Sequence, residues 1–134
     1  MIAASRLPAL LCALWLGALL AIAGIAAPAL FASLPVAQAA TAAARLFTAE
    51  AHLSLAMALV FALLERRRAG RGQGTQFSDG LMLSLAILFV TVVAQYGLPA
   101  SGIDSMASRH AVIVALYALK TGLVGALVWR LTLR

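Results

Sequence analysis

Three ionisable side chains and one amide interrupt otherwise apolar stretches of this sequence: Glu50, His52, Lys120 and Gln95. An ionised group inside a bilayer is costly unless it is paired or reaches water, so residues of this kind usually have a partner and mark substrate or ion pathways. A carboxylate and an ammonium can satisfy each other in that setting. Each of the four side chains is therefore a candidate site residue.

Hydrolytic chemistry is not indicated. Ser54 and Ser84 have no base at helical spacing, and no glycine-rich phosphate loop follows a strand pattern. We therefore expect no enzymatic activity.

The two histidines suggest a different chemistry, because imidazoles on separate helices can ligate one b-type haem or a copper ion. His52 and His110 are accompanied by no methionine cluster and no spacing motif. The competing interpretation is an interfacial histidine and a buried one bonded to a nearby hydroxyl, here that of Thr48. We expect no cofactor, and the haem or copper site is kept as an alternative.

The composition requires a lipid environment. Of the 134 residues, 64% are hydrophobic and 10% are charged, and the mean hydropathy is +1.04. This length allows one domain, residues 1–134. The formal net charge is +6, but the basic residues lie between and beyond the apolar segments and do not form a basic stripe on one face. Nucleic-acid binding is therefore not expected. Cys12 is the one cysteine of the sequence, which excludes an intrachain disulfide framework.

Four segments match the roughly 20 apolar residues that a helix needs to cross a bilayer core. They are residues 7–31, 46–64, 81–98 and 111–129. The fold class is therefore all-α, a bundle of four antiparallel transmembrane helices arranged up-down-up-down. Pro28 should kink the first helix. Residues suited to helix ends are Pro35, Ser78, Asp79, Gly97, Pro99, Asp104 and Ser105.

Arginines set the predicted orientation, because Lys and Arg near span ends are retained in the cytoplasm. One arrangement places seven of the nine arginines inside: Arg6, Arg66, Arg67, Arg68, Arg71, Arg130 and Arg134. Arg45 and Arg109 are then outside, and both termini are cytoplasmic. Arg66, Arg67, Arg68 and Arg71 act in this interpretation as topology determinants with affinity for anionic headgroups, or alternatively as a docking site for a partner.

The first forty residues also resemble a secretory signal, because Ala37-Gln38-Ala39 follows Arg6 and an apolar run. That run is longer than a typical signal, so we expect an uncleaved first helix. Nine arginines against one lysine, with abundant alanine, are typical of a bacterial chain from a high-GC genome. The expected location is the bacterial inner membrane.

The predicted orientation gathers the polar residues in the outer half of the bundle. Glu50 and Gln95 lie near the outer ends of their spans, and Lys120 leans towards them because side chains tilt to a helix N-terminus. This predicts a polar pocket of Glu50, Gln95 and Lys120 with Tyr117 on its rim. His52 falls nearly opposite Glu50 on the helix. In the alternative interpretation, Lys120 snorkels to a headgroup and Glu50 lies at the interface.

Small residues recur at helical spacing in the first and fourth spans. The row in the first span is Ala13, Gly17, Ala21, Gly24 and Pro28, and the row in the fourth is Ala118, Gly122 and Ala126. Small side chains let membrane helices approach closely. We expect these rows to form packing faces.

Several short motifs are shared with a known family. They are Leu14-Trp15-Leu16-Gly17, Ala26-Ala27-Pro28-Ala29-Leu30-Phe31, Ala44-Arg45-Leu46-Phe47, and Arg109-His110 through Leu116-Tyr117. In these the chain resembles the bacterial four-span family called domain of unknown function 4149, related to transmembrane-protein-205-like proteins. The resemblance implies a topology and no established activity. A fainter similarity links the chain to copper-resistance-D and haem-dependent protoporphyrinogen-oxidase-like proteins, whose first helix carries a histidine that is missing here.

The functional hypothesis follows from the predicted pocket. We expect a non-enzymatic membrane protein that acts as a small permeation or export component, or as an accessory subunit of a larger membrane complex or a homo-oligomer. Its predicted site is the pocket of Glu50, Gln95, Tyr117 and Lys120. The alternative is a haem or copper redox protein that uses His52 and His110.

Overall fold

The computed structural model describes residues 2–71, 79–98, 102 and 106–133, and all of its regular elements are helices. They are α1 (Ile2–Ala21), η1 (Ile22–Ala26), α2 (Ala27–Ser33), α3 (Val36–Gly70), α4 (Asp79–Val92), η2 (Val93–Gly97) and α6 (Met106–Thr132). Within this part of the chain, four helical stretches are long and apolar enough to cross a membrane. These are Arg6–Ser33, Val36–Gly70, Asp79–Gly97 and Ser108–Thr132. The all-helical prediction is confirmed.

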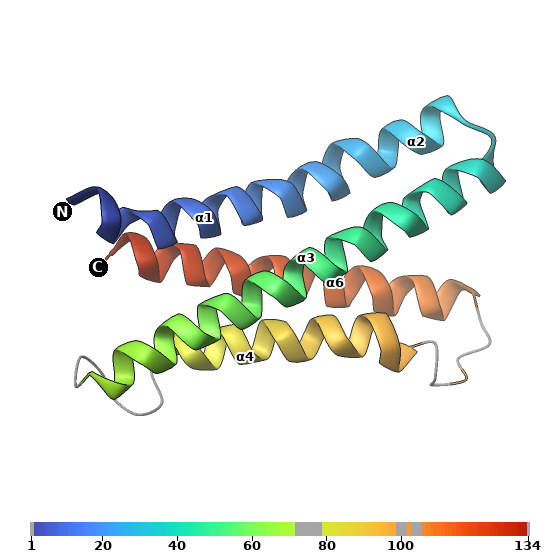
Figure 1. The fold of residues 1–134 in the computed structure, drawn as a ribbon. Coiled ribbons are helices and arrows are strands. Elements are labelled where there is room, and N and C mark those ends of the chain that lie inside the picture. Colours follow the sequence, from blue (N-terminus) through green and yellow to red (C-terminus); the bar gives the residue numbers. More distant parts are fainter. Residues whose placement is uncertain (1, 72–78, 99–101, 103–105, 134) are drawn as a thin grey trace.

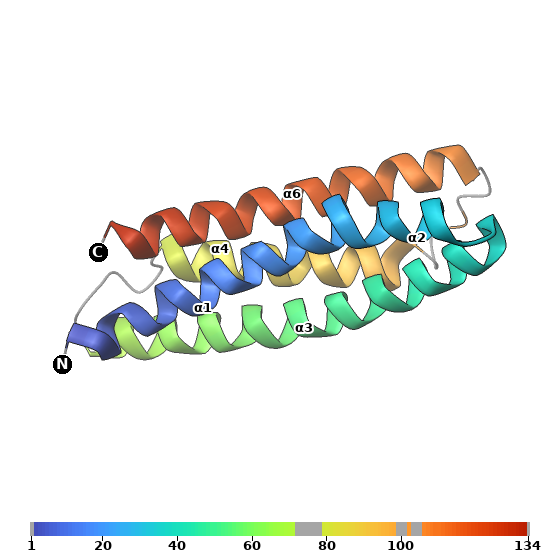
Figure 2. The same ribbon diagram turned by 90° about the horizontal axis from the view of Figure 1, so that it is seen from above.

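The helices lie side by side as one elongated bundle (Figures 1 and 2). α4 packs against both α3 and α6, and α6 also packs against α1. Both ends of the chain lie at one end of the bundle, together with the C-terminal end of α3 (Figure 1). At the opposite end, the α2–α3 hairpin turns away from α6, so this half of the bundle is more open.

Two wide π-helical turns interrupt the helices in that more open half. η1 precedes Pro28 and includes Gly24, and η2 includes Gln95. Proline has no N–H to donate to the carbonyl four residues earlier, and its ring crowds that carbonyl. A wide turn accommodates both effects. The disturbance expected at Pro28 is therefore a π-helical turn just before it.

The second helix differs most from its predicted span. α3 covers Val36–Gly70, whereas hydropathy indicated 46–64. Pro35 stands at its N-cap with extended backbone (φ −54°, ψ 142°), so the helix begins directly after the Leu34–Pro35 corner. Residues 37–44 are mostly alanine, the strongest helix former, and they continue the helix beyond the apolar stretch. The predicted helix ends at Ser78, Pro99, Asp104 and Ser105 lie outside the described residues.

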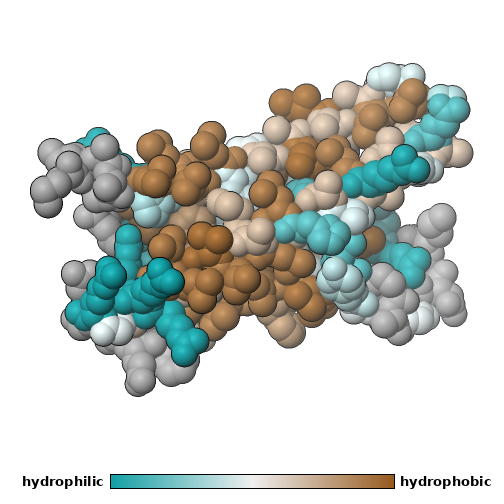
Figure 3. All heavy atoms as spheres, viewed as in Figure 1, coloured by the Kyte–Doolittle hydropathy of each residue, from teal (hydrophilic) through white to brown (hydrophobic). Residues whose placement is uncertain are grey.

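The hydrophobic core occupies the half of the bundle nearer the chain ends. Its buried members are Cys12, Trp15, Leu19, Ala58, Phe61, Ile87, Val124 and Leu127. The rings of Trp15 and Phe61 stack at its centre, with centroids 6.2 Å apart. On the visible face of the molecule, hydrophobic residues dominate the middle and hydrophilic ones gather towards the two ends (Figure 3). This is the distribution expected of a bundle embedded in lipid.

The rows of small residues do not pack inside the bundle, and that prediction is wrong for this chain. Gly17 of α1, Gly24 of η1 and Gly122 of α6 are exposed, and a Cβ added to any of them would meet nothing within 4 Å. The reason is that Trp15 and Leu19 turn the opposite face of α1 inward. The rows therefore face outward.

Candidate functional site

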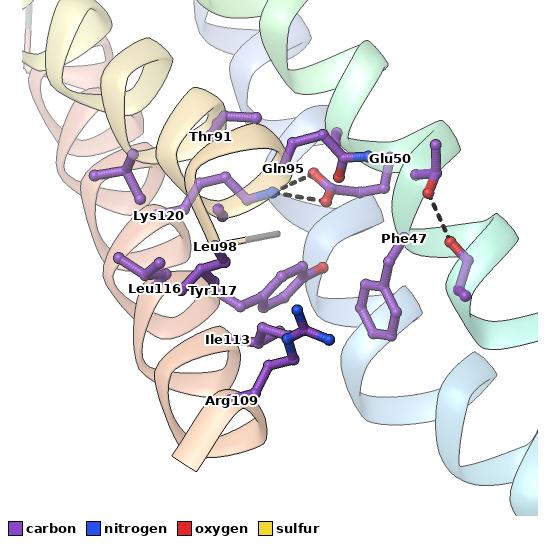
Figure 4. A pocket seen from close by; sticks show the side chains of 15 residues that line it. Phe47, Glu50, Thr91, Gln95, Leu98, Arg109, Ile113, Leu116, Tyr117 and Lys120 are labelled. Atoms are coloured by element: carbon purple, nitrogen blue, oxygen red, sulfur yellow. Dashed lines mark hydrogen bonds and ion pairs between the residues drawn. The ribbon is translucent and has the colours of Figure 1, made fainter. Parts of the chain in front are cut away.

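A buried ion pair between α3 and α6 forms the centre of the candidate site. Lys120 Nζ donates to Glu50 Oε1 at 2.7 Å and to Oε2 at 2.6 Å (Figure 4). Glu50 is 4% exposed and Lys120 is 5% exposed. A pair this deeply buried is held by mutual charge, because either group alone would carry a large desolvation penalty. The snorkelling interpretation does not describe this arrangement.

A hydrogen-bonded chain extends the ion pair to α1. The Ser54 hydroxyl donates to Glu50 Oε1, and the indole Nε1 of Trp15 donates to Ser54 Oγ at 3.1 Å. The Glu50 carboxylate thus accepts hydrogen bonds from its own helix and from α6. Sequence reasoning overlooked this role for Trp15 and Ser54. The available signal was that Ser54 lies one helical turn after Glu50, where the two side chains can meet.

Tyr117 connects the pair to its surroundings through both its ring and its hydroxyl. The Lys120 ammonium lies 4.8 Å from the centre of the Tyr117 ring, within the range of a cation–π contact. The hydroxyl donates to the Leu19 carbonyl oxygen at 2.8 Å, and the ring meets Phe47 edge to face. Tyr117 therefore fixes α6 against α1 while it supports Lys120 from one side.

A cavity of about 420 Å³ lies beside the ion pair, lined by α3, α4, η2 and α6. Its polar lining residues are Thr48, Glu50, Thr91, Gln95, Arg109, Tyr117 and Lys120. All four residues predicted for the pocket, Glu50, Gln95, Tyr117 and Lys120, line this one cavity. The volume falls within the range of small-molecule sites, roughly 300–1,000 Å³.

Arg109 also lines the cavity, although it was not among the residues predicted for the pocket. From the sequence it was used to predict the orientation of the chain in the membrane. It lies near the start of α6, eleven positions before Lys120. In Figure 4 its side chain extends from the helix towards the ring of Tyr117. The charged lining residues are then Arg109, Lys120 and Glu50, two positive and one negative. With Glu50 and Lys120 neutralising each other, the cavity has one positive charge in excess.

The core separates this cavity from the end of the bundle that carries the termini. Beyond Glu50 along α3 lie Ala58 and Phe61, and beyond Lys120 along α6 lie Val124 and Leu127, all of them buried. Phe61 stacks on Trp15 within that layer. A buried apolar layer therefore lies between the cavity and that end of the bundle.

The histidines lie away from the cavity. His52 is exposed on α3, with its Nδ1 2.8 Å from the backbone oxygen of Thr48. The predicted bond to the Thr48 hydroxyl is wrong, because that hydroxyl donates to the Ala44 carbonyl oxygen. His110 is exposed near the start of α6. Neither histidine lines the cavity, and the described residues hold no cluster of three or more potential metal ligands.

The basic segment lies at the end of the bundle that carries the termini. Arg66 and Arg67 are exposed in the last turns of α3, and Arg71 follows the helix. Arg68 Nη1 lies 3.4 Å from Oε1 of the buried Glu65. At the same end, Arg130 Nη2 of α6 pairs with Asp79 Oδ2 at the start of α4 at 2.8 Å.

These features define a multi-pass helical membrane protein with a buried ion pair beside a cavity. A family model described as a domain of unknown function (DUF4149) matches residues 10–111, and the chain belongs to this family. Glu50, Gln95 and Arg109 fall within the matched stretch, and Tyr117 and Lys120 follow it. No curated protein and no solved structure matches the chain.

Proposed function

We propose that this chain is a non-enzymatic membrane protein that binds a small molecule in its cavity and acts as a component of small-molecule permeation or export. The observation that carries the proposal is the Glu50–Lys120 pair, buried and facing a cavity of about 420 Å³. Buried ion pairs are often no more stabilising than apolar residues of the same volume. A pair placed beside a cavity is therefore better explained by a ligand than by folding.

The proposal includes an orientation. The bundle runs up-down-up-down in a bacterial inner membrane, with both termini in the cytoplasm and the cavity towards the outside. Support comes from the basic residues: Arg66, Arg67, Arg68 and Arg71 belong to the C-terminal end of α3, which lies with both chain ends (Figure 1). Anionic headgroups of the cytoplasmic leaflet would bind these side chains.

The ion pair provides a means of responding to a ligand. Two Lys120–oxygen distances account for two of the three ammonium protons, which leaves a third donor for a group in the cavity. Ser54 donates to Glu50 and accepts from Trp15 of α1, so movement of the ion pair would shift or break a hydrogen bond to α1. Passage across the membrane would further require the layer around Trp15 and Phe61 to open.

Mass spectrometry of the small molecules that co-purify with the protein in mild detergent tests this proposal. Wild type should retain a molecule that Lys120→Met and the cavity-filling Ala94→Leu lose. Arg45→Gln is the matched control, because Arg45 does not line the cavity, and it should retain the molecule. Identical retention by wild type, Lys120→Met and Ala94→Leu would contradict the proposal.

A second candidate function, as an accessory subunit or homo-oligomer, is favoured by the outward-facing rows of small residues. Gly17, Gly24 and Gly122 leave open space beside α1 and α6, and small residues of this kind let a further helix approach closely. Native mass spectrometry of Gly17→Leu tests this candidate. The bulkier side chain should release a bound partner, whereas Ala23→Leu, which is exposed in η1 of the same membrane span and outside the row of small residues, should not.

A further inference from the structure

We propose that the cavity takes a monoanionic amphiphile, a molecule with one carboxylate or phosphate group on an apolar body, and that Arg109 binds the anion. This inference rests on the proposed function, because it names the ligand class of the same cavity. It depends on three observations: a cation and an amide that have no partner among the described residues, and an apolar wall.

The cation is Arg109. Among the described residues, Glu50 is the one acidic residue that lines the cavity, and both of its oxygens are engaged by Lys120. Among the described residues Arg109 has no acceptor, although its side chain extends towards Tyr117 inside the cavity lining (Figure 4). A guanidinium presents a planar set of donors that fits a carboxylate or phosphate with two parallel hydrogen bonds. Arg109 is exposed beside the cavity, so it can receive an anion of this shape from outside the protein.

The unused amide is that of Gln95 on η2. It is half-buried, lines the cavity and makes no hydrogen bond to the described residues. Polar groups taken out of water without a partner carry a free-energy cost, which a ligand with an acceptor or donor would relieve. The Gln95 amide and the third Lys120 proton are thus available deeper in the cavity, beyond the anion held by Arg109.

The wall between these polar groups is apolar. Phe47, Leu98, Ile113 and Leu116 line it, with Ala94 leaving room between them. A small hydrophilic anion such as inorganic phosphate would leave this wall in contact with water. An apolar body attached to the anion would cover it, and each buried CH₂ group contributes about 0.8 kcal/mol.

We place the entry of such a molecule at the end of the bundle that holds Arg109. There the α2–α3 hairpin diverges from α6 (Figure 1), and hydrophilic residues are visible at the surface (Figure 3). An amphiphile could enter there with its charge near the membrane surface and its tail in the bilayer. A lipid headgroup and a free amphiphile share this chemistry.

Equilibrium binding of radiolabelled dodecanoate to the full chain in phosphatidylcholine nanodiscs tests the inference, under conditions that keep the carboxylate ionised. Dodecanol carries the same tail without the charge, and inorganic phosphate carries charge without a tail. We expect saturable binding of dodecanoate and affinity at least about tenfold lower for dodecanol, the difference expected for loss of one charged hydrogen-bonded contact. Inorganic phosphate should not compete. Equal affinity for dodecanoate and dodecanol would overturn the inference, as would competition by inorganic phosphate.

Arg109→Gln should lower the affinity for dodecanoate by about tenfold and leave that for dodecanol unchanged. Arg109→Lys should restore part of the loss, and Arg45→Gln should behave as wild type. The melting temperature of Arg109→Gln shows whether the variant is folded. If it is folded and binds dodecanoate as tightly as wild type, the inference is overturned. Phosphatidylglycerol in the nanodisc should displace dodecanoate if lipid is the natural source of the anion. If a free amphiphile is the source, it should not.

Ala94→Leu separates the two proposals. If Ala94→Leu binds both probes less tightly and wild type binds the two probes equally, the cavity is a ligand site but is not selective for an anion. In that case only the further inference would fall. Unchanged binding of both probes in Ala94→Leu would show that the cavity is not the site, and both proposals would fall.

Discussion

Lys120 and Glu50 are seventy positions apart in the chain, yet the Lys120 ammonium contacts both oxygens of the Glu50 carboxylate in the interior of the bundle. The pair joins α6 to α3, two helices that both pack on α4. Beside the cavity the two helices are connected by this ion pair and by the edge-to-face contact of Phe47 with Tyr117.

Lys120→Met should allow membrane insertion but destabilise the fold. Methionine fills a similar volume, so the main effect is a buried Glu50 carboxylate without its counter-charge, and breaking a pair of this kind costs about 3–5 kcal/mol. Thermal unfolding in detergent measures the loss. Lys120→Ala combined with Glu50→Ala removes both charges and should be better tolerated than Lys120→Met alone. A double variant less stable than the single one would show that the pair itself, rather than the uncompensated charge, stabilises the bundle.

Ser54→Ala should destabilise the bundle more than Ser84→Ala. Both hydroxyls are fully buried, but Ser54 links Trp15 to Glu50, whereas Ser84 donates only to the Gly80 carbonyl oxygen of its own helix. Loss of Ser54 leaves the Trp15 indole without its acceptor, for which about 1–3 kcal/mol is expected. Unfolding of the two variants under the same conditions compares them. Equal losses would mean that the Trp15–Ser54–Glu50 chain contributes no more than a local bond.

The four helices could be predicted from the sequence because hydropathy over about 20 residues is a strong signal. The start of α3 was missed because Gln38, Thr41 and Arg45 lower the hydropathy there, although alanine continues the helix. Hydropathy indicates the length of the apolar segment, whereas the length of the helix depends also on helix propensity and on the turn at Pro35. The apolar segment and the helix differ in length when polar residues extend the helix, as they do at the start of α3.

The site residues that could be predicted are those whose charge falls inside a membrane span. Glu50 and Lys120 are costly in lipid, so their pairing followed from depth and side-chain tilt. Arg109 gave no such signal, because an arginine at a helix end is unremarkable until the tertiary structure shows that it lines a cavity. The outward orientation of the Gly17 and Gly122 rows was equally hidden, since helical spacing defines a face but does not say what that face contacts.

Changing Arg66, Arg67, Arg68 and Arg71 to glutamine should give a mixture of orientations in the membrane. Seven arginines favour the cytoplasmic side in the proposed topology, and removal of four leaves three against the two on the other side. A reporter Gln38→Cys, at an exposed position near the start of α3, in a Cys12→Ser background and labelled with an impermeant thiol reagent on intact cells, measures the outward fraction. Uniform labelling as in the unmodified chain would mean that other residues set the orientation.

The haem or copper alternative makes a separate spectroscopic prediction. His52 and His110 are exposed and line no part of the cavity, whereas a haem needs an apolar pocket around its ring. We expect the purified protein to show no Soret band and copper at background level, and His52→Ala and His110→Ala to melt as wild type does. A Soret band lost in both variants would establish the alternative.

Gly80→Ala should destabilise the end of the bundle that carries the chain termini, although alanine is the better helix former. A Cβ on Gly80 would lie 2.8 Å from Glu65 Oε2 and 2.9 Å from its Cδ, so the buried carboxyl group would have to move. Overpacking of this kind costs about 1–3 kcal/mol, which exceeds the gain of up to about 1 kcal/mol in helix propensity. Gly125→Ala is the matched control, because its Cβ would meet nothing within 4 Å and should be neutral or stabilising. Thermal unfolding of both variants measures the difference. Equal stability would mean that Glu65 moves aside without loss, and a smaller effect of Gly80→Ala in a Glu65→Ala background would identify the carboxyl group as the cause.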